Sequence, residues 1–129
     1  TSLTENRLHA IEELIAWAAT QPPSEETRRE LLRRYSDGLH RGRHHEVMRF
    51  FERNQTALKS HPVMERVRDR MFELLTFLVE PDDPATTRLR NSMALFALHA
   101  SWFVLKDEAI PDDERRAAAL EVALELLHR

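Results

Sequence analysis

The sequence predicts an all-α fold, a helical bundle of about six helices in which the last two form a four-helix dimer interface. Three observations lead there. Apolar residues recur at helical spacing, only two glycines interrupt the chain, and no β-branched run alternates with polar residues. A chain of 129 residues with 42% hydrophobic and 32% charged residues suits one folded domain, so we expect a single domain over residues 1–129.

The first two helices are expected on either side of the dipeptide Pro22-Pro23. The first helix follows Ser2, and its apolar residues share one face: Leu8, Ile11, Leu14, Ile15 and Ala18. Ser24 is the expected cap of the second helix, because its hydroxyl can accept a hydrogen bond from a backbone N–H of the first turn. The apolar stripe of the second helix comprises Leu31, Leu32, Tyr35 and Leu39. A break is predicted in the segment DGLHRGRHH, around Gly38 and Gly42.

Four further helices are expected downstream. The third covers about residues 44–60, and the fourth runs from Pro62 to about Val79, since proline disfavours a helical residue before it. The segment EPDDPATT, with two prolines and three acids, predicts a loop. A long helix then covers about residues 87–106. The last helix runs from about Asp112 to the C-terminus, with acidic residues in its first turn.

The segment MALFALHASWFVL, residues 93–105, predicts a helix that is apolar on every side, because only His99 and Ser101 are polar. Such a helix must be buried on every side. Two interpretations stay open: a central core helix, or a helix that buries one face against a second molecule. The final helix favours the second interpretation, because the segment AAALEVALELL also carries more apolar surface than one core needs.

We therefore expect a homodimer in which the last two helices pair with their copies across a two-fold axis. The residues expected at this dimer interface are bulky or small apolar ones on the two helices: Leu95, Leu98, Trp102, Leu105, Leu120, Ala123, Leu124 and Leu127.

The histidines allow two kinds of site. His40 and His44 are four residues apart, a spacing that metal sites use on one helix, but Gly42 lies between them and no third ligand is evident. We favour a solvated connector that binds no metal. His99 has apolar neighbours, so it is either a core histidine whose hydrogen bonds are satisfied or a polar group that orients a ligand.

A ligand pocket is predicted among the aromatic and methionine side chains of the middle helices, although core packing explains most of these residues. Its predicted lining is Phe50, Phe51, Met71, Phe72, Phe96, His99 and Phe103. Flexible methionines and flat rings suit a small apolar or aromatic molecule. We expect no enzyme and no cofactor, because paired carboxylates on an apolar face, a glycine-rich phosphate loop and a strained serine turn are all missing from the sequence.

Charge and composition limit the partners of the chain. A net charge of −3 argues against this segment binding nucleic acid by itself. The lack of cysteine suits a reducing cytosol, and we expect a cytoplasmic protein. The predominantly apolar segment of thirteen residues is too short for a membrane helix, which needs about 20 residues. The chain begins at Thr1 without methionine, which predicts a fragment or a processed product.

Two segments resemble the C-terminal ligand-binding and dimerisation domain of tetracycline-repressor (TetR) family transcriptional regulators. They are ELLRRYSDGLHRGRHHEVMRFFERNQTALKSHPVMERVRDRMFELL and TTRLRNSMALFALHASWFVLKDEAIPDDERRAAALEVALELL. The resemblance implies that a small effector alters DNA binding of the intact repressor, and that DNA is bound only through an N-terminal helix-turn-helix, which this chain lacks. The alternatives are a helical protein–protein interaction module without a DNA-binding role and a small metalloprotein built on the histidines.

Overall fold

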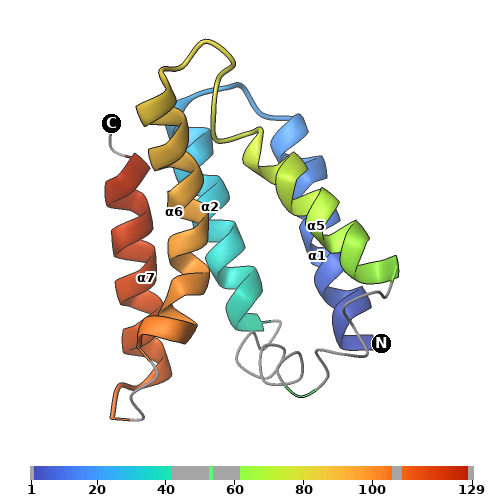
Figure 1. Ribbon diagram of the computed structural model, residues 1–129, viewed down its shortest axis with the longest axis vertical. Helices are drawn as coiled ribbons and strands as arrows, with labels where there is room; N and C mark the ends of the chain where they lie inside the picture. Colours follow the sequence, from blue (N-terminus) through green and yellow to red (C-terminus); the bar gives the residue numbers. More distant parts are fainter. Residues whose placement is uncertain (1, 42–52, 54–61, 106–108, 128–129) are drawn as a thin grey trace.

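The computed structural model describes residues 2–41, 53, 62–105 and 109–127, and every secondary-structure element in these ranges is a helix (Figure 1). The helices are α1 (Ser2–Ala19), α2 (Glu25–Arg41), α5 (Pro62–Leu75), α6 (Ala85–Val104) and α7 (Asp112–Leu127). The prediction of an all-α fold is confirmed, with five described helices where about six were expected. The helix expected over residues 44–60 lies outside the described residues, so nothing tests it.

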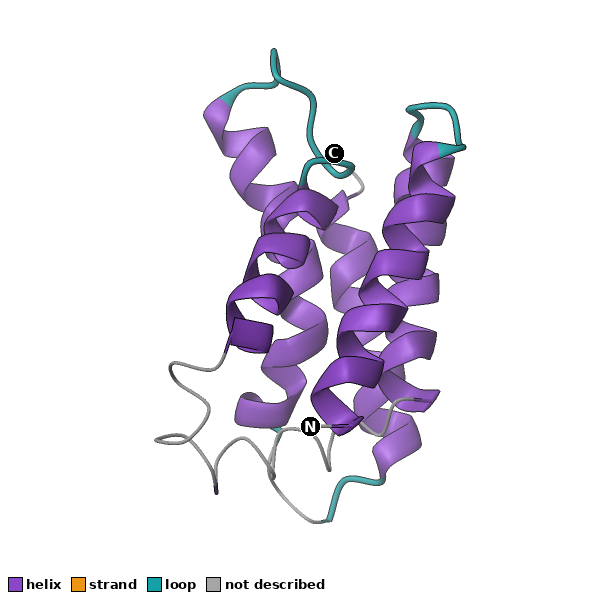
Figure 2. Ribbon diagram, turned by 90° about the vertical axis from the view of Figure 1, so that its right-hand side faces the viewer, coloured by secondary structure: helices purple, strands orange, loops and turns teal. Residues whose placement is uncertain are grey.

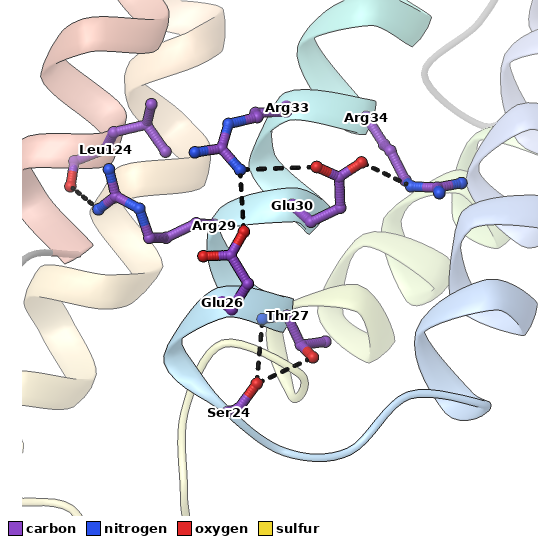
Figure 3. A network of polar contacts seen from close by, with 8 residues as sticks. All are labelled: Ser24, Glu26, Thr27, Arg29, Glu30, Arg33, Arg34 and Leu124. Atoms are coloured by element: carbon purple, nitrogen blue, oxygen red, sulfur yellow. Dashed lines mark hydrogen bonds and ion pairs between the residues drawn. The ribbon is translucent and has the colours of Figure 1, made fainter.

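Local sequence signals explain where α1 ends and α2 begins. The hydroxyl of Thr20 donates to the carbonyl of Trp17 at 2.7 Å, and the dipeptide Pro22-Pro23 follows. The Ser24 hydroxyl then accepts a hydrogen bond from the backbone N–H of Thr27 at 3.2 Å (Figure 3). This is the geometry of an N-cap, which satisfies one of the free N–H groups of the first helical turn. The predicted cap is thus confirmed.

The break was predicted in the segment DGLHRGRHH, around Gly38 and Gly42. Helix α2 continues through Gly38 and ends at Arg41, inside that segment, and Gly42 lies outside the described residues. Glycine lowers helix stability by about 0.5–1 kcal/mol relative to alanine but does not end a helix when the rest of the helix packs well. Here the apolar residues on either side of Gly38, Tyr35 and Leu39, are both buried. Tertiary packing therefore outweighs the weak local preference against the helix.

Helix α5 begins at Pro62 as predicted but ends four residues earlier than the predicted Val79. After Leu75 the backbone N–H groups of Thr76, Phe77 and Leu78 each bond to the carbonyl three residues before. Such bonds tighten the chain into a 3₁₀-type turn at a helix end. The turn places Leu78 in the core and directs its carbonyl toward the buried Asn91 of α6, which donates to it at 2.9 Å.

The helices form two pairs with α2 between them. Helices α6 and α7 pack against each other on one side, α1 and α5 on the other, and α2 contacts α1, α6 and α7 (Figure 1). All five run up and down along a common direction, and the loops gather at the two ends (Figure 2). The largest fully buried side chains are leucines from α2, from α5 and its following turn, and from α6: Leu31, Leu32, Leu74, Leu78 and Leu95.

Polar contacts on α2 also join it to its neighbours. Arg29 donates to the carbonyl of Leu124 in α7 at 3.4 Å (Figure 3). Arg116 of α7 forms an ion pair with Asp37 at 2.7 Å. Because such exposed pairs contribute little free energy, we regard them as orienting contacts, and the leucine core as the main source of stability.

No helix in the described part of the chain is both long enough and apolar enough to cross a lipid bilayer.

Candidate functional site

A polar cluster inside the bundle forms around Tyr35, the only tyrosine of the chain. Its hydroxyl lies 2.5 Å from Nε2 of His99 in α6, 3.4 Å from Sδ of Met71 in α5 and 3.3 Å from Nη2 of Arg7 in α1. Tyr35 itself belongs to α2, so one hydroxyl contacts side chains from three other helices, α1, α5 and α6. We call these four residues the Tyr35 cluster.

The hydrogen bonds of the Tyr35 cluster can be satisfied in two ways. A phenol has one hydrogen to donate and can accept from Arg7, which only donates. When Nε2 of His99 carries no hydrogen, the phenol donates to it, since imidazole nitrogen is a better acceptor than a thioether. When Nε2 carries a hydrogen, it donates to the phenol oxygen, and the phenol hydrogen can turn to Met71. The cluster thus accommodates either tautomer of His99.

Burial controls the ionisation of Tyr35. Removal from water raises the pKa of the phenol above its ordinary value near 10, while the positive charge of Arg7 and its hydrogen bond act in the opposite direction. Burial is the larger effect, so the phenol stays protonated and keeps its ability to donate.

A cleft of about 280 Å³ lies between α1 and α2, next to the Tyr35 cluster. Its lining from α1 is Arg7, Ala10, Ile11, Glu13, Leu14 and Trp17, and its lining from α2 is Arg34, Tyr35, Gly38 and Leu39. The guanidinium carbon of Arg34 lies 4.1 Å from the centre of the Trp17 ring, a cation–π contact that closes one wall. The cleft combines apolar walls with a few polar groups, as ligand sites do.

The predicted pocket residues do not gather at this cleft. Met71 and His99 are half-buried members of the Tyr35 cluster. Phe72, Phe96 and Phe103 are exposed to solvent by 61%, 43% and 58% respectively. Phe50 and Phe51 lie outside the described residues. His99 does not line the cleft, and its Nε2 lies within hydrogen-bond distance of the hydroxyl of Tyr35, a residue that the sequence analysis placed on the apolar stripe of the second helix.

The predicted interface residues divide into two groups. Leu95, Leu98, Ala123 and Leu127 are buried in the core of the chain itself, so they have little surface to offer a partner. The other four are half-buried: Trp102, Leu105, Leu120 and Leu124. The large apolar residues of α6 that are exposed are Leu89, Met93, Phe96, Phe103 and Val104. At 100° per residue these five fall on one side of the helix, opposite Leu95 and Leu98. We call them the α6 stripe.

Four residues that line the cleft were not predicted as site residues: Arg7, Trp17, Arg34 and Gly38. Their signal in the sequence was weak. Arg34 lies in the charge-rich segment TRRELLRRY, and only the glycine within an otherwise helical pattern indicated a special position. In the described ranges, no group of three or more His, Cys, Asp or Glu side chains could hold a metal ion. His40 is exposed, and His44 and His45 lie outside those ranges.

No protein-family model and no curated protein sequence matches this chain.

Proposed function

We propose that this chain is the ligand-binding and dimerisation domain of a transcriptional regulator of the TetR type, and that a separate helix-turn-helix binds DNA in the intact protein. The observation that carries the proposal is the α6 stripe. Five large apolar side chains along the outer side of one helix form a patch of the kind that soluble proteins cover with a partner. The occupant we propose is the same stripe of a second copy.

The spacing of the α6 stripe suits pairing of two helices. Leu89, Met93, Phe96 and Phe103 recur at intervals of four, three and seven residues, which is the repeat of a helix–helix seam. The half-buried Ala100 completes the repeat and is small enough for close approach. A two-fold interface uses the same surface of both subunits. The α6 stripe of one subunit would therefore pack against the α6 stripe of the other.

Charge beside the α6 stripe fits the same arrangement. Arg90 and Glu125 line one shallow hollow between α6 and α7, together with Val122 and Leu126. A two-fold axis that brings the hollows together would set Arg90 of each subunit opposite Glu125 of the other. Such reciprocal pairs fix orientation more than they add affinity.

The Tyr35 cluster supplies a route from a ligand to this interface. A ligand in the cleft would contact Tyr35, and the Tyr35 hydroxyl is hydrogen-bonded to His99 on α6. A ligand shifts the arrangement of two subunits only when it binds one arrangement more tightly than the other. In an intact regulator, that shift would change the separation of two DNA-binding heads, which must match half-sites about one helical turn apart.

The test is the molar mass of the chain in solution by light scattering over a concentration series. We expect a dimer that the double variant Phe96→Glu/Phe103→Glu converts into a folded monomer, because two carboxylates per subunit would be buried in the seam. Phe72→Glu is the control, since Phe72 is at least as exposed as Phe96 and Phe103 but lies on α5. Circular dichroism checks that each variant keeps its helices.

A wild-type monomer at all concentrations would contradict dimerisation through α6. The α6 stripe would then be open to a different protein, as expected of a helical protein–protein interaction module. A dimer that both variants leave intact would place the interface on another surface.

A further inference from the structure

The cleft between α1 and α2 is hollow because α2 has a glycine at position 38. A Cβ built at Gly38 meets no atom within 4 Å, so space is open in front of the backbone there. Gly38 lies one turn after Arg34 and next to Leu39, and all three line the cleft. A side chain of ordinary size at this position would occupy the hollow. The missing side chain thus creates the volume that a ligand would fill.

The charge of the cleft favours an anion. Arg7 is half-buried, and among the described residues its only polar partner is the Tyr35 hydroxyl, at 3.3 Å. A guanidinium has five N–H donors, so most of those on Arg7 remain available to a ligand. Arg34 also lines the cleft, although Glu30 pairs with it at 3.0 Å. The one acid in the lining, Glu13, is mostly exposed and pairs with His9 at 2.9 Å.

The rest of the lining favours an anionic ligand whose remaining part is flat and apolar. Ile11, Leu14 and Leu39 supply aliphatic walls, and Trp17 supplies an aromatic one. The cleft volume of about 280 Å³ is slightly below the roughly 300–1,000 Å³ typical of ligand sites, so it suits a small ligand. Arginine binds carboxylates through two parallel hydrogen bonds, which fixes orientation.

We propose that the cleft between α1 and α2 binds a small aryl carboxylate, with the carboxylate on Arg7 and the ring system between the aliphatic walls over Gly38. This inference deepens the proposed function, because it names the chemical class of the effector, and it rests on that function only for the regulatory consequence. Binding itself requires just this one chain.

The experiment is calorimetric titration of the chain with three probes of one shape: 2-naphthoate, 2-naphthamide and 2-naphthylmethylammonium. We expect the anion to bind about tenfold or more tightly than the neutral amide, and the cation to bind most weakly. Arg7→Met should abolish the preference of the anion over the amide. Gly38→Leu should weaken all three probes by about tenfold or more, because its side chain fills the hollow. Arg33→Met, on the same helix but outside the cleft lining, should change nothing.

Equal binding of the three probes, a preference for the cation, or no binding at all would overturn the proposal. So would a preference for the anion that survives Arg7→Met, or affinities that Gly38→Leu leaves unchanged. If Gly38→Leu fails to fold by circular dichroism, the Arg7→Met comparison decides alone.

Light scattering on the same samples separates this inference from the proposed function. A dimer that binds no naphthoate keeps the proposed function and removes the ligand class. A monomer that prefers naphthoate, and loses that preference with Arg7→Met, keeps the ligand class and removes the dimeric mechanism.

Discussion

Tyr35 is the residue whose chemistry depends most on the fold. Its hydroxyl touches Arg7, Met71 and His99, which lie 28, 36 and 64 residues away in the chain. A buried hydroxyl without partners costs about 1–3 kcal/mol. The cluster removes that cost and ties α2 to three other helices.

The raised pKa of Tyr35 predicts how stability depends on alkaline pH. Because burial disfavours the phenolate, the folded chain retains a proton that the unfolded chain loses near pH 10. The unfolding free energy should therefore be unaffected by this group below pH 10. It should fall as pH rises from there through the higher pKa of the folded state. Urea unfolding measured between neutral and strongly alkaline pH checks this dependence.

Tyr35→Phe is the control for that titration, since it removes the ionising group and retains the ring. The variant should lose about 1–2 kcal/mol at neutral pH, from the missing hydrogen bonds, and should show a shallower alkaline decline. Because Tyr35 is the only tyrosine, phenolate absorbance of the folded protein reports its pKa directly. A pKa at or below the ordinary value near 10 would contradict the argument from burial.

At the scale of single elements, α2 balances helix stability against an open cleft. Gly38 lies inside the helix, where glycine is less favourable than alanine because it leaves more backbone freedom in the unfolded chain. Its missing side chain is also what leaves the cleft open. The residue that lowers the stability of α2 is therefore the same residue that leaves space in the candidate site.

Gly38→Ala should stabilise the chain by about 0.5–1 kcal/mol, since the added methyl group meets open space and the helix propensity rises. Ala10→Gly is the matched opposite change on α1, also in the cleft lining, and should lose a similar amount. Thermal or urea unfolding of both variants tests the pair. A loss of stability with Gly38→Ala would mean that the space at Gly38 is filled.

On the scale of the whole molecule, one leucine-rich core joins the two helix pairs through α2. Leu74 of α5 belongs to it and is fully buried, whereas Phe72, two residues earlier on the same helix, is 61% exposed. Hydrophobicity alone does not separate the two residues, since leucine and phenylalanine are both commonly buried. Their positions in the assembled bundle decide which one contributes to stability.

Leu74→Ala should therefore lower the unfolding free energy by about 2–5 kcal/mol, through lost burial and the cavity it leaves. Phe72→Ala should change it by no more than about 0.5 kcal/mol, as for other surface substitutions. Urea denaturation of the two variants side by side makes the comparison. Similar losses from both would show that Phe72 is covered in solution, either by this chain or by a second copy.

Local signals in the sequence account for the class of fold and for most helix boundaries. Spacing of apolar residues, the Ser24 cap and Pro62 are local signals, and they act within a few residues through backbone hydrogen bonds and fixed torsion angles. Two places depart from the local signals: α2 continues through Gly38, and α5 ends at Leu75, before the predicted Val79. In both places contacts from distant parts of the chain outweigh or end the local pattern.

Which side of each helix is core and which is surface depends on how the helices pack together. The sequence presents α6 as apolar all round, and no local rule distinguishes Leu95, which is buried, from Phe96, which is exposed. The neighbouring helices make that choice by covering one side. The same packing brings Tyr35 to His99 and opens the cleft beside Gly38. Tyr35 and His99 are 64 residues apart, so their contact depends on the relative positions of α2 and α6. The periodicity of apolar residues along one helix carries no information about those positions.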